Sequence, residues 1–173
     1  MLKMFTTQLS GLFSRLQGKE EWMMEDAARL LAQAAVGEGT IYIKGFEEMK
    51  GVTEEALNGE EPMACALELQ NVDDLDGADR VLIVTRRSTD EDAIALARKL
   101  LDKQIPFTVI SGTVKEAEED LTTLADVHLN TQLVKGMLPD ESGNRFGFPS
   151  LVAALYLYHG LKFSLDEMIA ENE

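Results

Sequence analysis

The segment from Thr85 to Asp90 (TRRSTD) combines hydroxyl and guanidinium donors in a chain whose formal net charge is −15. It follows a continuous apolar run and precedes an amphipathic stretch, so it joins an expected strand to an expected helix. Backbone N–H groups at a helix N-terminus attract anions, and an arginine can bind a phosphate with two hydrogen bonds. The segment therefore predicts an anion site that consists of Thr85, Arg86, Arg87, Ser88 and Thr89. The alternative is plain helix capping, with the arginines paired to nearby acids.

A second segment, from Lys44 to Glu48 (KGFEE), follows another expected strand. Gly45 would let a backbone or a ligand approach closely. Neither a dinucleotide-binding glycine motif nor a P-loop motif occurs, so the sequence does not indicate nucleotide chemistry of those kinds. Glu47 and Glu48 could act as a base, but glutamates at the start of a helix more often complement the helix dipole.

Histidine and cysteine are scarce in the chain. His128 lies in an expected strand and His159 lies on an apolar helical stripe; each could transfer a proton, but a packing role is favoured. Cys65 stands in an apolar run and is expected to be a small buried strand residue rather than a nucleophile. The spacing of His, Cys and acidic residues does not match a metal site, so we expect neither a metal nor a cofactor.

The elements that position these residues can be read from hydrophobic periodicity. Expected strands span residues 40–44, 63–69, 81–84, 106–110 and 127–129. Expected helices span 46–57, 117–124 and 149–159. A further helix is expected to begin after an N-cap at Ser88 or Thr89 and to have its apolar face between Ala93 and Leu101. This alternation predicts a three-layer α/β fold with a doubly wound, mostly parallel five-stranded sheet. We expect one domain, with a helical lead-in over 1–36, an α/β core over 37–160 and a tail helix over 161–173.

The ends of the chain carry further predictions. The lead-in is expected to form two helices that Gly18 separates, and the second would end in a left-handed glycine near Gly37. A loop is expected over 131–144. The last segment would begin with a Ser-x-x-Glu capping box at Ser164 and Glu167.

Composition restricts the function. At 173 residues the chain suits one domain, and a net charge of −15 argues against nucleic-acid binding, which needs a broad basic surface. One cysteine fits a reducing compartment, and we expect a cytoplasmic protein. The longest apolar run, Leu151–Tyr158, is far short of the ~20 residues of a membrane span. The amphipathic first 16 residues could lie on a membrane, but a packing or dimerisation helix is favoured.

Three stretches resemble one known family. They are GEGTIYIKG over 37–45, ADRVLIVT over 78–85 and LADVHLN over 124–130. Their order resembles that of the sugar isomerase (SIS) domain, and the similarity covers roughly residues 19–160. The nearest comparison is a phosphoheptose-isomerase-like branch that includes uncharacterised bacterial members. The resemblance implies a five-stranded parallel sheet, dimers or tetramers, and phosphosugar binding at the strand ends.

The family's phosphate motif, Ser-x-Ser-Gly-x-Thr, is altered here. Without gaps, Thr85 stands at the first serine, Arg87 at the second, Ser88 at the glycine and Asp90 at the threonine. The glycine-rich turn after the first strand is reduced to residues 45–47. The resemblance therefore implies that phosphate recognition has moved to the arginines or has been lost.

Two functional hypotheses follow from the resemblance. In the first, the chain binds a small phosphorylated sugar and isomerises it between aldose and ketose, with His159 and a glutamate as acid and base. Glu55 is the candidate glutamate, and Glu60 and Glu61 are alternatives. In the second, the chain is a non-catalytic sensor or a dimeric interaction module. A third alternative, a flavodoxin-like or receiver-like domain, would have the same kind of sheet. It is not favoured, because this chain lacks the aspartates that such a domain is expected to have at the end of its first strand. Both hypotheses imply a homodimer or larger homo-oligomer, no nucleic acid and no membrane.

Overall fold

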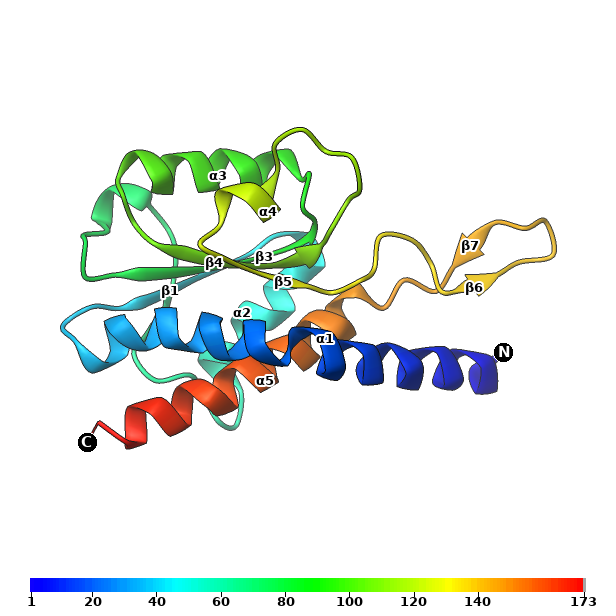
Figure 1. The fold of residues 1–173 in the computed structure, drawn as a ribbon, viewed down its shortest axis with the longest axis horizontal. Helices are drawn as coiled ribbons and strands as arrows, with labels where there is room; N and C mark the ends of the chain where they lie inside the picture. Colours follow the sequence, from blue (N-terminus) through cyan, green and yellow to red (C-terminus); the bar gives the residue numbers. More distant parts are fainter. Residues whose placement is uncertain (173) are drawn as a thin grey trace.

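A five-stranded parallel sheet forms the centre of the protein (Figure 1), seen in a computed structural model that describes residues 1–172. The strands lie in the order β2-β1-β3-β4-β5, and each neighbouring pair is parallel. Their bounds are Ile41–Gly45 (β1), Ala66–Glu68 (β2), Arg80–Arg87 (β3), Phe107–Gly112 (β4) and Val127–Asn130 (β5). The predicted α/β fold with its five-stranded sheet is confirmed.

Helices cover both faces of the sheet (Figure 1). One face carries α1 (Leu2–Val36), α2 (Lys50–Asn58) and α5 (Ser150–Ala170), and the other carries α3 (Glu91–Asp102) and α4 (Leu121–Leu124). The apolar run of β3 explains this arrangement. Leu82 and Val84 pack into the core on the first face, whereas Val81 and Ile83 pack into the core on the second. Such a strand needs cover on both sides.

The strand order reverses between β1 and β3. The chain runs from β1 outward to β2 at one edge, and then from β3 through β4 to β5 at the other. Open sheets with this order bind ligands in the crevice at the carboxyl ends of β1 and β3. The short helix η1 (Glu47–Met49) follows β1 at this edge, and α3 begins shortly after β3.

Both long terminal helices differ from the prediction. The lead-in is one helix, so the predicted break at Gly18 is wrong; this glycine faces solvent, with no described atom within 4 Å of an added Cβ. Gly37 has a φ of −87°, so the predicted left-handed cap is also wrong. At the other end, α5 is continuous to Ala170. Ser164 donates a hydrogen bond to the Gly160 carbonyl oxygen and does not cap a separate helix.

Three connecting segments also differ from the prediction. Cys65 is exposed just before β2, with a φ of +55°, so its predicted burial in a strand is wrong. The helix expected over 117–124 is only α4, because Asp120 caps it late. The loop expected over 131–144 contains the first strand of a hairpin, β6 (Leu138–Pro139), which pairs with β7 (Arg145–Phe146). The hairpin projects from the body (Figure 1). Within residues 1–172, no helix is long and apolar enough to cross a membrane.

Candidate functional site at the carboxyl edge of the sheet

Gly45 ends β1 and allows the next turn to fold back against it. A Cβ on this residue would lie 2.2 Å from the carbonyl oxygen of Met49. The Gly45 N–H donates to Thr53 Oγ1 at 3.0 Å, and Phe46 N donates to the Val84 carbonyl oxygen at 2.9 Å. The chain itself therefore occupies the space beside Gly45. This close packing places η1, and with it Glu48, next to the end of β3.

A carboxylate faces the donors of the turn after β3. Asp90, at the start of α3, accepts hydrogen bonds from Thr85 Oγ1 at 2.6 Å and from Arg87 N at 3.0 Å. These are donors that an anion would need, and Asp90 also lies at the positive end of the α3 dipole. The turn thus carries its own anionic group. Thr89 lies half-exposed in the same turn.

Ser88 is fully buried and is part of the scaffold behind the turn. Its hydroxyl accepts a hydrogen bond from Val114 N at 2.9 Å, and its N–H donates to the Gly112 carbonyl oxygen. Burial raises the pKa of Asp120, but hydrogen bonds from Ser88 and Thr122 outweigh that effect and hold the pKa of this carboxyl below its usual value. Ser88 therefore joins the ends of β3 and β4 to the segment before α4.

Arg86 forms a two-pronged ion pair with Glu48. The Nε of Arg86 donates to Glu48 Oε1 at 2.7 Å, and its Nη2 donates to Oε2 at 2.5 Å. The hydroxyl of Ser150, in the first turn of α5, also donates to Oε1 at 2.8 Å. The hydrogen bond from Arg86 is the main reason that the pKa of Glu48 lies below its usual value. A fixed, ionised carboxylate therefore stands where β1, β3 and α5 meet.

An open pocket of about 580 Å³ lies beside this ion pair, and we call it the basic pocket. Its lining comes from the ends of β1 and β3, the loop after β5 and the segment before α5: Glu48, Arg86, Arg87, Val134, Lys135, Gly136, Arg145, Phe146 and Phe148. The Arg87 guanidinium lies 5.3 Å from the ring centroid of Phe148 and donates to the Val134 carbonyl oxygen at 3.3 Å. Arg145 donates to the Met137 carbonyl oxygen.

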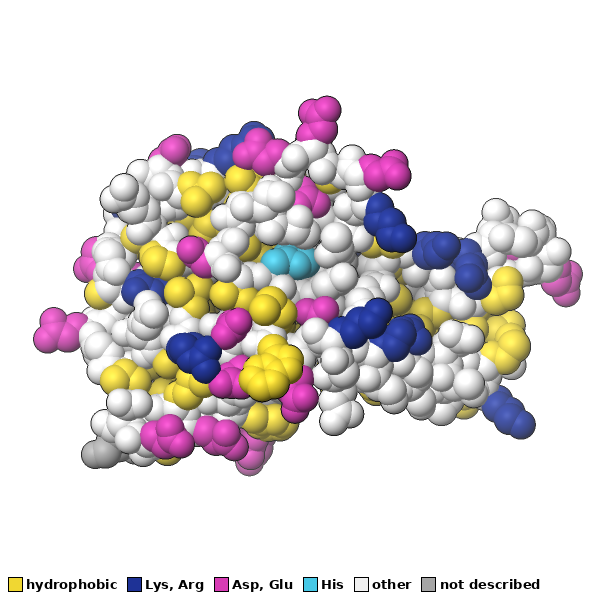
Figure 2. Space-filling model, in the orientation of Figure 1, with side chains coloured by type: hydrophobic (Ala, Val, Ile, Leu, Met, Phe, Trp, Pro, Cys, Tyr) yellow, Lys and Arg dark blue, Asp and Glu magenta, His cyan; other side chains and the backbone are white. Residues whose placement is uncertain are grey.

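The charge of this pocket is opposite to that of the chain. It contains four of the 16 Lys and Arg residues but only one of the 31 acidic residues. In the described part of the chain, Arg87, Lys135 and Arg145 form no salt bridge. Figure 2 shows Lys and Arg side chains gathered between the sheet and the hairpin. The pocket therefore has an uncompensated positive charge that suits a small anion.

The predicted acid–base pair comes together elsewhere. His159 Nε2 on α5 lies 3.8 Å from Glu55 Oε1 on α2, and both side chains are about two-fifths exposed. His159 is nine residues beyond Ser150, or about 13 Å along α5 at roughly 1.5 Å per residue. Because Ser150 contacts Glu48 of the basic pocket, the pair lies well away from that pocket along the helix.

His128, on β5, pairs with a serine of the neighbouring strand β4. Its Nε2 lies 2.7 Å from Ser111 Oγ, and burial lowers its pKa to about 4. Ser111 is completely buried whereas His128 is only partly buried, so the hydrogen bond ties a partly exposed imidazole to the interior of the sheet. Among residues 1–172, no cluster of three or more His, Cys, Asp or Glu side chains is arranged to hold a metal ion.

Sequence reasoning did not find several residues of the basic pocket. Lys135 lies in the predicted loop over 131–144, and Arg145, Phe146 and Phe148 lie between that loop and the predicted helix over 149–159. Glu48 was favoured as a surface acid that complements a helix dipole. The available signal was weak: two basic residues, Lys135 and Arg145, and two phenylalanines in a segment that contains Gly and Pro and also two acids. Nothing in that pattern shows that the loop folds back to the end of β3.

Solved structures of SIS-type proteins share this fold. Phosphoheptose isomerase GmhA from Neisseria gonorrhoeae aligns with a TM-score of 0.64 at 14% identity, covering 96% of this chain and 100% of that chain. The sugar isomerase domain of the RpiR transcription factor from Sphaerobacter thermophilus gives 0.61 at 14% identity, covering 99% and 94%. The protein c3406 of E. coli CFT073, in complex with arabinose 5-phosphate, gives 0.67 at 11% identity, covering 96% and 89%. The chain therefore has the fold of the SIS domains.

Sequence similarity defines the family more narrowly. The domain of unknown function DUF2529 matches residues 1–169, and the chain belongs to this family. It is also 40% identical over 172 residues to the uncharacterized protein YwjG of Bacillus subtilis (strain 168), and the alignment covers 99% of both chains. The likeness to SIS domains is thus a likeness of fold, and it agrees with the fold that the sequence motifs implied.

Proposed function

We propose that this protein binds a small phosphorylated sugar in the basic pocket. The observation that carries the proposal is the charge of that pocket, which has four cationic residues and one acid in a chain of net charge −15. Phosphate oxygens accept their strongest protein hydrogen bonds from guanidinium and ammonium groups. The SIS-type fold, together with the arabinose 5-phosphate complex of an E. coli protein of that fold, supports a sugar phosphate as the ligand class.

Each lining group has a distinct part in this proposal. Arg87, Lys135 and Arg145 hold the phosphate, and Arg87 is already positioned by the ring of Phe148 and by a backbone carbonyl. Glu48 is ionised and fixed by its arginine partner, so it can accept hydrogen bonds from sugar hydroxyls. The aromatic side chains offer apolar surface to the C–H groups of the sugar.

The residues predicted from the sequence divide into two groups under this proposal. Arg86 and Arg87 keep a binding role, with Arg86 acting through Glu48. Thr85 and Ser88 instead shape the turn, because Asp90 accepts the Thr85 hydroxyl hydrogen bond and Ser88 accepts one from Val114. The proposed phosphate site is thus formed by the arginines and the loop after β5, and not by the start of α3 as the sequence predicted.

Thermal unfolding with millimolar ribose 5-phosphate tests the proposal. A ligand at 100 times its Kd stabilises the folded state by about 2.7 kcal/mol, which raises the melting temperature of a chain of this size by several degrees. The double variant Arg87→Gln/Arg145→Gln should lose that rise. Arg98→Gln is the matched control, because Arg98 is an exposed arginine on α3 paired with Glu119. No rise in the unmodified protein, or an undiminished rise in the double variant, would contradict the proposal.

Aldose–ketose isomerisation is a second candidate, and the Glu55–His159 pair is the observation that favours it. A carboxylate and an imidazole 3.8 Å apart and open to solvent could move a proton between C1 and C2 of a sugar. The distance along α5 argues against it, because His159 lies about 13 Å along the helix from Ser150, which contacts Glu48 of the basic pocket. We therefore place binding without turnover first.

Proton exchange distinguishes these candidates. An isomerase incorporates solvent deuterium at C1 or C2 of the sugar phosphate, which NMR detects, whereas a sensor does not. His159→Gln should abolish the exchange while leaving the ligand-induced rise in melting temperature unchanged. Exchange that survives the substitution would exclude His159 from the reaction. The absence of exchange in the unmodified protein would rule out isomerisation and leave ligand binding as the only candidate function.

A further inference from the structure

A second concavity lies on the α3 side of the sheet, where the chain crosses from β2 to β3. Parallel strands are usually joined by a helix that covers the sheet between them. Here residues 69–79 make the crossing, and within the described chain their helical part is only the one-turn η2 (Val72–Asp74). Because α3 does not extend over β1 and β2, an open trough of about 650 Å³ remains between α3, β1 and this crossing; we call it the crossover trough.

Two lysines in the crossover trough are available for a ligand. Lys44 projects from the face of β1 opposite to the buried Ile41 and Ile43, and Lys99 projects from α3. Neither has a hydrogen-bond or salt-bridge partner among residues 1–172. Lys103, by contrast, is held by the carbonyl oxygens of η2 and of the residue after it, at 2.9–3.1 Å.

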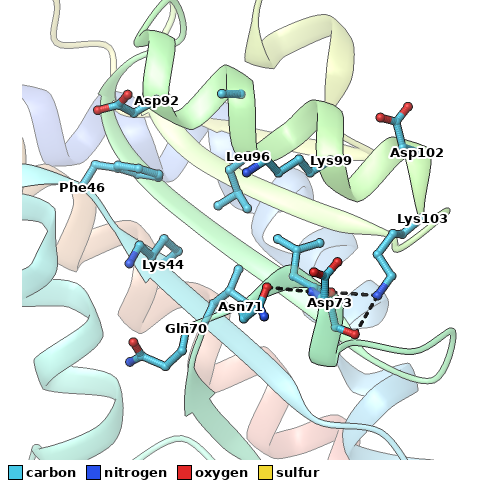
Figure 3. A pocket seen from close by; sticks show the side chains of 13 residues that line it. Lys44, Phe46, Gln70, Asn71, Asp73, Asp92, Leu96, Lys99, Asp102 and Lys103 are labelled. Carbon is cyan, nitrogen blue, oxygen red and sulfur yellow. Dashed lines mark hydrogen bonds between the residues drawn. The ribbon is translucent and has the colours of Figure 1, made fainter.

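Apolar and amide groups accompany these lysines. Figure 3 shows Leu96 beside Lys99 and Phe46 farther along α3, below Asp92, with Gln70 and Asn71 on the opposite side of the trough. The side-chain oxygen Oδ1 of Asn71 accepts a hydrogen bond from Asp73 N at 3.1 Å, which leaves its side-chain NH2 as a donor. Asp73, Asp92 and Asp102 also line the trough. The trough therefore presents the two lysines that are unpaired within residues 1–172 beside three carboxylates, an apolar wall and two carboxamide groups.

We infer that the crossover trough is a second ligand site, of a size and chemistry that suit a nucleoside monophosphate. Lys44 and Lys99 bind the phosphate, and the base lies against Phe46 and Leu96. The carboxamide side chains bind the polar edge of the base, as Asn and Gln do with adenine. Pockets of small ligands commonly combine an apolar lining with a few polar groups at this volume. The crossover trough and the basic pocket share no lining residue, so the two sites are separate.

Isothermal titration with adenosine 5′-monophosphate tests this inference. We expect binding at millimolar or lower concentration, and a Kd at least tenfold higher in Lys44→Gln/Lys99→Gln. Lys50→Gln is the matched control, because Lys50 is an exposed lysine at the start of α2. An unchanged melting temperature of the unliganded double variant would show that the fold is intact.

Three outcomes would overturn the inference. They are no binding of adenosine 5′-monophosphate, an equal loss in Lys50→Gln, and a loss in Arg87→Gln/Arg145→Gln but not in the lysine double variant. Ribose 5-phosphate separates this site from the proposed function, since its binding should depend on the arginines alone. If ribose 5-phosphate binds the trough as tightly as the nucleotide does, the base makes no contribution and the assigned ligand class is wrong.

Discussion

Two polar side chains outside the candidate site, the partly buried His128 and the buried Tyr158, affect stability in different ways. His128 is paired with Ser111 at 2.7 Å between β4 and β5, and burial keeps its imidazole neutral. Tyr158 is completely buried on α5, and its hydroxyl has no hydrogen-bond partner among the described residues. The first group should make the fold sensitive to acid, whereas the second should cost stability at every pH.

Stability should fall as the pH falls from about 6.5 to 4. The pKa of His128 is about 4 in the folded state and 6.5 in the unfolded chain, so the unfolded chain takes up a proton first. The associated stability is present above pH 6.5 and decreases by roughly 3 kcal/mol as the pH approaches 4. Urea unfolding at several pH values should show a shallower loss in His128→Gln. Parallel pH profiles for the two proteins would contradict this account.

Replacing Tyr158 by Phe should leave the protein equally stable or more stable. The substitution removes a hydroxyl that lacks a partner within residues 1–172 and keeps the ring that packs in the core. An unpaired buried polar group costs about 1–3 kcal/mol, and part of that is recovered when it is removed. Chemical unfolding at neutral pH measures the change. A loss of stability would show that the hydroxyl has a partner, such as a bound water.

At the scale of elements, the turn from β1 into η1 should tolerate little change. A Cβ on Gly45 would lie 2.2 Å from a backbone oxygen, so Gly45→Ala must displace η1 and with it Glu48. We expect about 1–3 kcal/mol of destabilisation and weaker sugar-phosphate binding. Gly18→Ala is the matched control: it has open space within α1 and should stabilise the protein by about 0.5–1 kcal/mol. Equal effects of the two substitutions would contradict the packing argument.

The sequence predicted some of these elements well and others poorly. Strand β3 can be recognised in the sequence as a continuous apolar run, because a parallel strand is buried on both faces. Helix α3 can be recognised equally well from the helical spacing of its apolar residues. Gly18 was predicted to separate two helices and a helix was predicted to end at residue 159, although Gly18 and Gly160 each lie within a continuous helix. Tertiary packing accounts for Gly160, because an added Cβ would lie 2.2 Å from Met24 Sδ where α1 and α5 cross closely. Local propensity contains no information about such a contact.

At the scale of the whole molecule, the fold and the candidate site differ in how far they could be predicted. Five strands alternating with helices define the sheet, so the position of the strand-end crevice follows from topology. The chemistry of the crevice does not follow. Arg87 was found because it lies in the segment that follows the clearest predicted strand. Lys135 and Arg145 reach the same pocket only because the segment after β5 folds back across the sheet edge.

NMR titration of the labelled protein with ribose 5-phosphate tests the central claim most directly. The account predicts that backbone amide shifts will concentrate at residues 86–87, 134–136 and 145–148, which line the basic pocket. Amides of the exposed α3 residues around Arg98 should remain unchanged and serve as an internal control. Perturbations confined to the first turn of α3, or the absence of any perturbation at millimolar ligand, would contradict a sugar-phosphate site in the basic pocket.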